Sequence, residues 1–402
     1  MFLNRGFIVI FMVMMLLPLI FVDLSSDRVS VKENRRLAKF PSLSDLKRHP
    51  GQFIRDFDAW FKDSTGFREQ FLALYNITGM NTMNGVHYMK GQDVYLVGEY
   101  GHHFYAGEHG KLIQSFLGKP ILSGEQLANM ANKLEEIKVY LDKRGIPFVV
   151  MFCTFKEEIY PEFYPKSIKQ GEEPIQLDLI TSYIKEHTSV DVFNIRRALL
   201  TEKDNYLLYP VSSGDLNHYT EIGAFFAYRE LMKHINIYFP EITPYSLNDI
   251  DISYDKEYFI DRIMEPDVSL KTKNKYKKLD LSFFDDIDVK WSFPWAYTAY
   301  ENIDANLPVI LFFRDSFSGY FAADYEKKFI TQFIASHFGR AIFIHYLNLK
   351  YFEEYVAKYK PDIVVFASVM PDDFAQCVDV VPELANMRDD SSETPKVFNK
   401  KE

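Results

Sequence analysis

A chain of 402 residues, 47% of them hydrophobic and 25% charged, is long enough to bury a large core, which excludes a wholly disordered protein. The formal net charge is −10 and no basic run interleaved with aromatic residues follows the chain, which argues against nucleic acid as a partner. With two cysteines, Cys153 and Cys377, the chain is not a disulfide scaffold.

The N-terminus has the sequence pattern of a targeting signal. Residues 7–22 are apolar and uncharged, and as a helix they would span about 24 Å at about 1.5 Å per residue. No pair of small residues follows this segment, so the sequence predicts that residues 1–24 are an uncleaved anchor. Arg5 precedes the segment while Asp23 and Asp27 follow it, which predicts that the body of the protein lies outside the cytoplasm. A buried N-terminal helix of a soluble protein is the alternative.

The region after the apolar segment changes character twice. Residues 25–50 are polar and are predicted to form a tether. Residues 51–90 are predicted to be helical, and residues 91–110, where apolar residues alternate with glycines, predict short strands or a hairpin. A helical pair is predicted, with Phe53, Phe57, Trp60 and Phe61 on one face before Gly66 and Phe67, Phe71, Leu74 and Tyr75 after it.

An alternation of helices and buried strands follows. Ser123 opens a Ser-x-x-Gln capping box, apolar residues follow at helical spacing, and Gly145 ends this predicted helix. Residues 240–305 break the alternation and are predicted to be an irregular insertion. Apolar runs separated by helices predict a mainly parallel, three-layer α/β/α fold. The predicted strands are 147–153, 190–194, 307–313, 341–346 and 362–367, and the further predicted helices are 174–187, 220–235, 320–335 and 349–359.

A nucleophilic site is predicted where two of these segments end. The apolar run 307–313 leads into Ser316, which places this serine at the carboxyl end of a strand, where open α/β sheets bind ligands. Asp215-x-x-His218, just before a predicted helix, offers a base and a carboxylate that orients it. Ser316, His218 and Asp215 are the predicted triad. The structural alternatives are a helix-capping role for His218, an Asx turn at Asp215 and an N-cap at Ser316.

Attack on an ester carbonyl also requires donors for the oxyanion. The backbone N–H of Phe317, directly after the predicted nucleophile, would be the first donor. Arg314 and Asn348 are the candidates for a second one.

Aromatic residues offer candidate contacts for a sugar. Trp291 and Trp295 in the insertion, together with Tyr219, are predicted to bind substrate, and a small core under a loop is the alternative for the insertion aromatics. Three histidines between residues 102 and 109 match no zinc spacing and are predicted to lie on a surface loop. No metal and no cofactor is predicted.

Several motifs together carry a resemblance to a known family. They are Glu33-Asn-Arg-Arg-Leu-Ala-x-x-Pro41, Phe61-Lys-Asp-Ser-Thr-Gly-Phe-Arg68, Lys156 with Tyr160-Pro161, Asp215-x-x-His218-Tyr-Thr220, Asp315-Ser-Phe-Ser318 and Lys360-Pro-Asp362. In this order, and over most of the chain, they resemble the SGNH-like proteins of polysaccharide O-acetylation, the alginate O-acetyltransferase family. Those proteins are circularly permuted, so that Asp and His precede Ser. Leu216 stands where the family has the Asp of Asp-x-His-Trp, and residues 367–370 lack an Asn.

The resemblance implies an SGNH-like domain over residues 51–385 and leaves a charged, disordered tail over residues 386–402. It implies transfer of an acetyl group, through acetyl-Ser316, onto hydroxyls of an extracytoplasmic polysaccharide. A membrane-bound O-acyltransferase partner would supply the acetyl group, and the protein would be a single-pass protein of the inner membrane with a periplasmic catalytic domain. An acetylesterase with the same triad and a non-catalytic glycan-binding assembly subunit are the alternatives.

Overall fold

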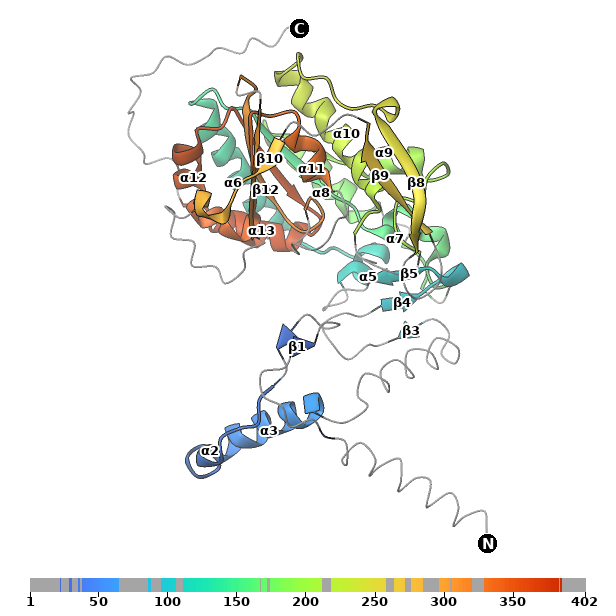
Figure 1. Cartoon of the computed structure of the whole chain (residues 1–402), viewed down its shortest axis with the longest axis vertical. Coiled ribbons are helices and arrows are strands. Elements are labelled where there is room, and N and C mark those ends of the chain that lie inside the picture. Colours follow the sequence, from blue (N-terminus) through green and yellow to red (C-terminus); the bar gives the residue numbers. More distant parts are fainter. Residues whose placement is uncertain are drawn as a thin grey trace. The chain divides into compact units, whose positions relative to one another are not determined.

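The structure is a computed structural model, and the residues that it describes are 22, 29–30, 35–36, 38–64, 86–87, 95–105, 111–166, 168–171, 174–211, 218–257, 264–271, 276–284, 296–303, 306–319, 329–382 and 384. They fall into two units, residues 1–94 and 95–402, and each unit is described by itself (Figure 1). The predicted anchor lies almost entirely outside the described residues. None of the helices in the described part of the chain has the length and apolarity that a bilayer crossing requires.

The first unit contains the predicted aromatic helix. In α3, Phe57 stacks on Phe53 and on Phe61, each with ring centroids 6.2 Å apart, because residues four apart share one face of a helix. Trp60 is buried against Phe40, with centroids 4.7 Å apart. Part of the predicted tether is helical. The elements of this unit are β1 Val29–Ser30, β2 Arg35–Arg36, α2 Leu43–Arg48, α3 Pro50–Ser64 and β3 Val86–His87.

The second unit is built on a seven-stranded sheet in the order β10-β11-β13-β12-β14-β6-β7. All neighbours from β13 to β7 are parallel, while β11 and β10 add an antiparallel edge. The five predicted strands are the five parallel ones, so the mainly parallel sheet is confirmed. The strands are β6 Phe148–Phe152, β7 Asp191–Asn194, β10 Tyr276–Lys278, β11 Tyr297–Asn302, β12 Val309–Arg314, β13 Arg340–His345 and β14 Ile363–Ser368.

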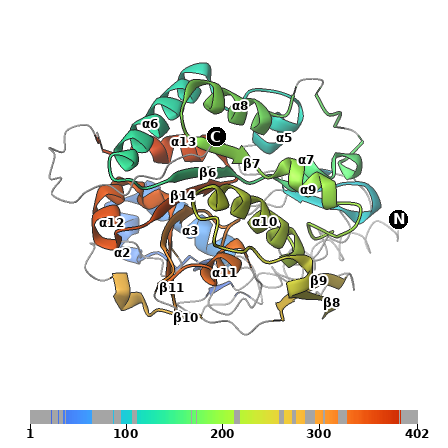
Figure 2. The same cartoon turned by 90° about the horizontal axis from the view of Figure 1, so that it is seen from above.

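Helices cover both faces of this sheet, which confirms the three-layer architecture. Figure 2 shows α6, α8 and α13 on one side of the sheet and α10 and α11 on the other. Leu311 and Phe313 of β12 join the core cluster with α6, α8, α12 and α13, so the alternate residues of β12 face α10 and α11. Ser123 caps α6 as predicted: its hydroxyl accepts from the Gln126 N–H at 3.1 Å, and the Gln126 side chain accepts from the Ser123 N–H at 2.9 Å.

The helices of the second unit differ from the predicted ones in number and length. The short α5, α7 and α9 were not predicted, because each has too few residues for a clear apolar stripe, and the C-terminal α13 was not predicted although Phe374, Cys377 and Val378 form such a stripe. In the predicted helix 320–335, only α11 lies in the described residues. The helices are η1 Glu99–Gly101, α5 Lys111–Phe116, α6 Gly124–Asp142, α7 Lys156–Ile159, η2 Pro161–Phe163, α8 Gln176–His187, α9 Arg196–Glu202, α10 Glu221–Tyr238, η3 Leu247–Asp249, η4 Leu281–Phe284, α11 Ile330–Ala335, η6 Tyr346–Tyr351, α12 Phe352–Tyr359 and α13 Pro371–Asp379.

Two antiparallel pairs complete the second unit. β4 Tyr95–Val97 pairs with β5 His103–Tyr105, which confirms the hairpin predicted from the glycine-rich segment. In the insertion, β8 Ile250–Glu257 pairs with β9 Met264–Leu270. The Val268 N–H of this hairpin donates to the buried Glu221 carboxylate at 2.7 Å, so the insertion is joined to the first turn of α10.

Candidate active site

Ser316 lies in a tight turn directly after β12, at the carboxyl edge of the sheet. It is half-buried, whereas Asp315, Phe317 and Ser318 around it are buried. In a parallel sheet this edge collects the strand-to-helix loops, which is where ligands bind. The position predicted for the nucleophile is therefore the position that Ser316 has.

Asp315 fixes the turn. Its Oδ1 accepts from the Phe317 N–H at 2.9 Å and its Oδ2 accepts from the Val369 N–H at 2.7 Å, which joins the turn to the end of β14. Burial raises the pKa of Asp315, and the two N–H groups, His218 and Arg314 offset part of the rise. The Phe317 N–H that was predicted to serve the oxyanion is thus engaged by Asp315 in this structure.

Arg314 braces the same turn from the face of the sheet that α11 covers. Its buried guanidinium donates from Nη1 to the carbonyl of Gly319 at 2.6 Å and to that of Asp315 at 3.3 Å. Burial lowers its pKa to about 10. Gly319 leaves the room for this contact, since a Cβ there would lie 3.0 Å from the Thr331 side chain and 3.1 Å from Arg314 Nε. Arg314 was a candidate oxyanion donor, but the structure uses Nη1 to hold backbone carbonyls of the turn.

His218 meets the turn from a distant part of the chain. Its buried ring lies 4.8 Å from the ring of Phe317 and 6.0 Å from that of Phe329, measured between centroids. The helix that follows is capped by Thr220, whose Oγ accepts from the Gly223 N–H at 3.2 Å, so His218 is not the N-cap of α10. The structure therefore brings His218 to the residue next to Ser316. Asp215, the third member of the predicted triad, lies outside the described residues.

The other predicted site residues divide into three groups. Tyr219 is fully buried between the rings of Tyr209 and Phe317, both 5.2 Å away, so it forms core beneath the turn and offers no face to a sugar. Asn348 is also fully buried, and its Nδ2 donates at 3.4 Å to the carbonyl of His345 three residues earlier. Trp291 and Trp295 lie outside the described residues.

A pocket adjoins the turn at the ends of β6 and β14. Phe155 lines it and packs edge-on against Phe317, with centroids 5.3 Å apart. Val369, which donates to Asp315, lines it as well. An ion pair between Lys111 and Asp372 belongs to its wall. The remaining lining residues are Leu112, Ser115, Ile121, Glu158, Leu177, Met370 and Pro371, so most of the wall is apolar.

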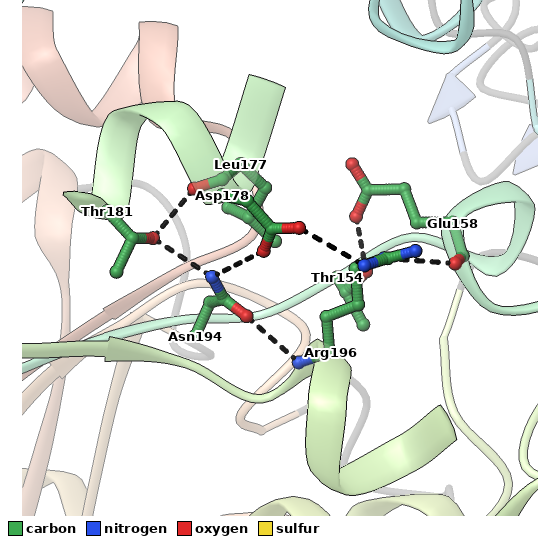
Figure 3. A network of polar contacts seen from close by, with 7 residues as sticks. All are labelled: Thr154, Glu158, Leu177, Asp178, Thr181, Asn194 and Arg196. Atoms are coloured by element: carbon green, nitrogen blue, oxygen red, sulfur yellow. Dashed lines mark hydrogen bonds and ion pairs between the residues drawn. The ribbon is translucent and has the colours of Figure 1, made fainter. Parts of the chain in front are cut away.

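Polar side chains hold the end of β6 against the end of β7 (Figure 3). Thr154 donates to the Glu158 carboxylate, and Arg196 Nε donates to the Glu158 carbonyl at 3.2 Å. Arg196 also pairs with Asp178 at 3.1 Å, and Asn194 Nδ2 donates to the same carboxylate at 3.0 Å. Burial, the largest influence, raises the pKa of Glu158 to about 7. This network fixes the loop that carries Phe155 and Glu158 to the pocket.

Asp315 and Lys156 were quoted in sequence motifs without a role. Each is a charged residue that follows a buried strand closely, and each is itself buried. A charge in that position seldom stays buried without partners, so this pattern is the signal that marks both residues as organisers of the sheet edge. Cys153, the residue after β6, is a buried free thiol. Among the described residues, no cluster of side chains is suited to hold a metal ion.

Comparison with known proteins gives structural similarities. No family model matches the sequence, and no curated protein resembles it in sequence. A DHHW family protein from Eubacterium siraeum is 13% identical with a TM-score of 0.48, over 74% of this chain and 97% of that one. Bacillus cereus PatB1 is 14% identical with a TM-score of 0.46, over 70% and 97%. The O-acetyltransferase domain of Pseudomonas putida AlgJ is 14% identical with a TM-score of 0.40, over 75% and 95%.

Proposed function

We propose that this chain is a serine acyltransferase that moves an acetyl group onto hydroxyls of an extracytoplasmic polysaccharide. The observation that carries the proposal is the contact of the His218 ring with Phe317, the residue after Ser316, at the carboxyl edge of the parallel sheet. A serine hydroxyl needs a base within hydrogen-bond reach to attack a carbonyl. The imidazole, from a distant segment, thus contacts the residue that follows Ser316, at the edge where such sheets bind ligands.

The reaction would proceed in two balanced steps. Ser316 Oγ attacks the acetyl carbonyl carbon of the donor ester while its proton passes to His218, and collapse of the tetrahedral intermediate breaks the bond to the leaving oxygen, which takes that proton. A sugar hydroxyl then attacks acetyl-Ser316 with His218 as base. The new ester bond forms, the bond to Ser316 Oγ breaks, and Oγ recovers the proton. Asp215 would hold the imidazole in the required tautomer.

The oxyanion would be held by the turn itself. The Phe317 N–H points into the turn and donates to Asp315 Oδ1, so it serves the oxyanion only when it is shared with, or released by, that carboxylate. A shift of the Asp315 side chain would release it. The position of the Asp315 carboxylate would therefore decide whether the Phe317 N–H is free for the oxyanion.

The pocket beside the turn, which neither Ser316 nor His218 lines, would take a part of the substrate next to the reacting carbonyl. Its walls are mainly apolar, which suits the methyl of an acetyl group or the face of a sugar ring. The resemblance to polysaccharide O-acetylation proteins favours acetyl as the acyl group. That resemblance also supports a membrane-bound O-acyltransferase as donor, and the N-terminal apolar segment supports inner-membrane anchoring with a periplasmic catalytic domain.

A direct assay tests this function. The full chain is incubated with 4-nitrophenyl acetate and a panel of oligosaccharides, and acetylated sugar is sought by mass spectrometry. We expect acetylated sugar from the wild type and from Ser318→Ala. The control variant removes a serine hydroxyl two residues away from Ser316. We expect no acetylated sugar from Ser316→Ala, and no acetyl-enzyme in that variant.

The other outcomes are equally informative. Free acetate from the wild type without acetylated sugar, across acceptors that include the native polysaccharide, would assign the chain as an esterase. Wild-type behaviour of Ser316→Ala, in the assay and in polysaccharide acetylation by cells, would leave a non-catalytic assembly subunit.

A further inference from the structure

Lys156 is a buried lysine for which the proposed reaction has no use. It is 2% exposed, and its ammonium donates to the carbonyls of His103 at 2.7 Å, of Val211 at 2.8 Å and of Pro210. The Phe104 ring lies 4.8 Å from the same nitrogen. An ammonium has three N–H donors and is costly to bury unless all are engaged. Here three backbone carbonyls replace its water shell.

Two of these carbonyls belong to the segment that leads to His218. Pro210 and Val211 are the last described residues before the stretch that contains Asp215. The Val211 carbonyl also accepts from the His103 N–H at 2.7 Å. The ammonium and the backbone of β5 therefore hold the same point of the chain.

The rest of this segment, residues 207–211, is bonded to the start of α10. The Thr220 N–H donates to the Leu208 carbonyl at 3.0 Å, and the Thr220 hydroxyl donates to the Leu207 carbonyl at 2.6 Å. The approach is close, because a Cβ at Gly223 would lie 2.4 Å from the Leu208 oxygen. His218 is two residues before Thr220, so its position follows from that of segment 207–211.

The α7 side fixes the same segment with hydroxyl groups. The Tyr160 hydroxyl accepts from the Leu208 N–H at 3.2 Å, and the Tyr209 hydroxyl donates to the Thr154 carbonyl. Segment 207–211 is therefore bonded to residues near α7 on one side and to the start of α10 on the other. A displacement at the ammonium would therefore pass to His218 through backbone bonds and would not be absorbed by solvent.

We infer that Lys156 is a positioning residue for His218: through Pro210, Val211 and Thr220, its ammonium sets where the imidazole meets the Ser316 turn. The catalytic consequence rests on the proposed function, whereas the structural consequence does not. A displacement of about 1 Å in a reacting group costs on the order of a hundredfold in rate, so the effect is measurable.

Lys203, whose side chain is 20% exposed, offers a control for the loss of a lysine that hydrogen-bonds near α7. Lys203 Nζ donates to the Ile159 carbonyl at 3.0 Å and to Glu162 at 2.9 Å, and it lies 5.7 Å from the Tyr160 ring centre. It thus supports the same α7 turn, but its hydrogen bonds go to residues 159 and 162 and not to segment 207–211. A role in stability alone predicts that, in both variants, the labelling of Ser316 and the exchange in residues 205–222 change only as far as the loss of global stability accounts for.

The experiment compares Lys156→Met, Lys156→Arg and Lys203→Met in the full chain. Amide hydrogen exchange is followed in the peptide 205–222, and the labelling of Ser316 by phenylmethylsulfonyl fluoride is timed across a pH series. In labelling, Ser316 Oγ displaces fluoride from sulfur and its proton leaves through His218. We expect Lys156→Met to label at least tenfold more slowly than Lys203→Met, with an altered pH profile and faster exchange in 205–222. Lys156→Arg should recover part of both properties.

Each result decides the inference. Equal labelling rates, pH profiles and exchange in Lys156→Met and Lys203→Met would overturn it. If the wild type does not label, but exchange in residues 205–222 is faster in Lys156→Met and not in Lys203→Met, the positioning is upheld and the proposed chemistry is rejected. Should Lys156→Met fail to fold, Lys156→Arg decides: it keeps the charge but changes the donor geometry, so unchanged exchange and labelling in it would overturn the inference.

Discussion

The Ser316 turn and the segment that presents His218 are held by different kinds of contact. In the turn, Arg314 and Asp315 bond to backbone groups of residues 315–319, Asp315 also accepts from the Val369 N–H, and the Ser318 carbonyl accepts from the Thr331 N–H. Segment 207–211 depends instead on Lys156 and Tyr160, about fifty residues earlier in the chain. Short-range contacts close small loops at little entropic cost, whereas distant ones form only when the sheet is assembled. We therefore expect the turn to survive disturbances that displace His218.

The largest effect is expected from a substitution that removes the contact between the two regions. His218→Gln should lower acetyl transfer and Ser316 labelling on the order of a hundredfold to ten-thousandfold, because the base is lost while the turn keeps its own bonds. Turnover of 4-nitrophenyl acetate at saturating and at low substrate measures this loss.

A second buried histidine is the control. His337 Nε2 lies 2.6 Å from the Tyr228 hydroxyl, and burial lowers its pKa to about 4. His337→Gln should cost stability and leave turnover within a few fold of the wild type. A His218→Gln protein as active as His337→Gln would refute the role of His218.

Next in size is the removal of the carboxylate that fixes the turn. Asp315→Ala leaves the Phe317 and Val369 N–H groups without their acceptor, which should lower the free energy of unfolding by about 4 kcal/mol. It should also slow labelling of Ser316, because the loss of the turn geometry outweighs the release of the Phe317 N–H. Urea denaturation measures the first effect.

The amino end of β12, the strand that leads into the turn, offers the comparison. Asp362 Oδ2 accepts from the Val309 N–H at 2.9 Å, so Asp362→Ala should cost about 2 kcal/mol for a single lost bond and leave labelling unchanged. Equal labelling by the two variants would mean that Asp315 has no part in the site.

The free energy of unfolding should depend on pH through Glu158, which supports the pocket and not the Ser316 turn. The Glu158 carboxyl has a pKa of about 7 in the folded chain against 4.5 as its ordinary value, because it is buried. Between these values the folded chain keeps a proton that the unfolded chain has lost, so the free energy of unfolding falls as pH rises from 4.5 to 7.

Glu158→Gln should remove this fall while keeping an acceptor for Thr154. The difference between wild type and variant should change on the order of 3 kcal/mol across this window. Unfolding by urea at several pH values measures the difference, which also contains the change at Glu157, because burial and the Glu158 charge both raise the pKa of that carboxyl. A difference that stays constant with pH would show that Glu158 ionises normally.

The smallest effect is expected from the removal of one hydroxyl, that of Thr220. Thr220→Ala removes the cap of α10 and the bond to the Leu207 carbonyl, and should cost about 1 kcal/mol. Ser123→Ala removes the cap of α6 at a similar cost. Only Thr220→Ala should slow labelling of Ser316, because only Thr220 lies beside His218. Thermal unfolding and labelling rates measure the two effects, and equal labelling in both variants would contradict this account.

The sequence determined the elements whose signals are local. Five apolar runs predicted the five parallel strands, the Ser123 capping box predicted the start of α6, and Ser316 was placed at a strand end from the run that precedes it. These signals work because burial and capping act on residues close to one another in the chain. The pairing of His218 with Ser316 was predicted from a serine at a strand end and an Asp-x-x-His unit before a helix, but spacing alone does not say which loops meet, so the contact itself is a result of the tertiary structure.

Only the tertiary structure decided how the charged and aromatic residues at the sheet edge are used. Tyr219 was expected to face a sugar and is core, Arg314 was expected to face an oxyanion and holds carbonyls, and Lys156 bonds to carbonyls more than fifty residues away on both sides of it in sequence. A side chain's partners at such distances depend on sheet order and on which face a strand residue occupies. Both are set by packing of the whole sheet, so no local pattern encodes them.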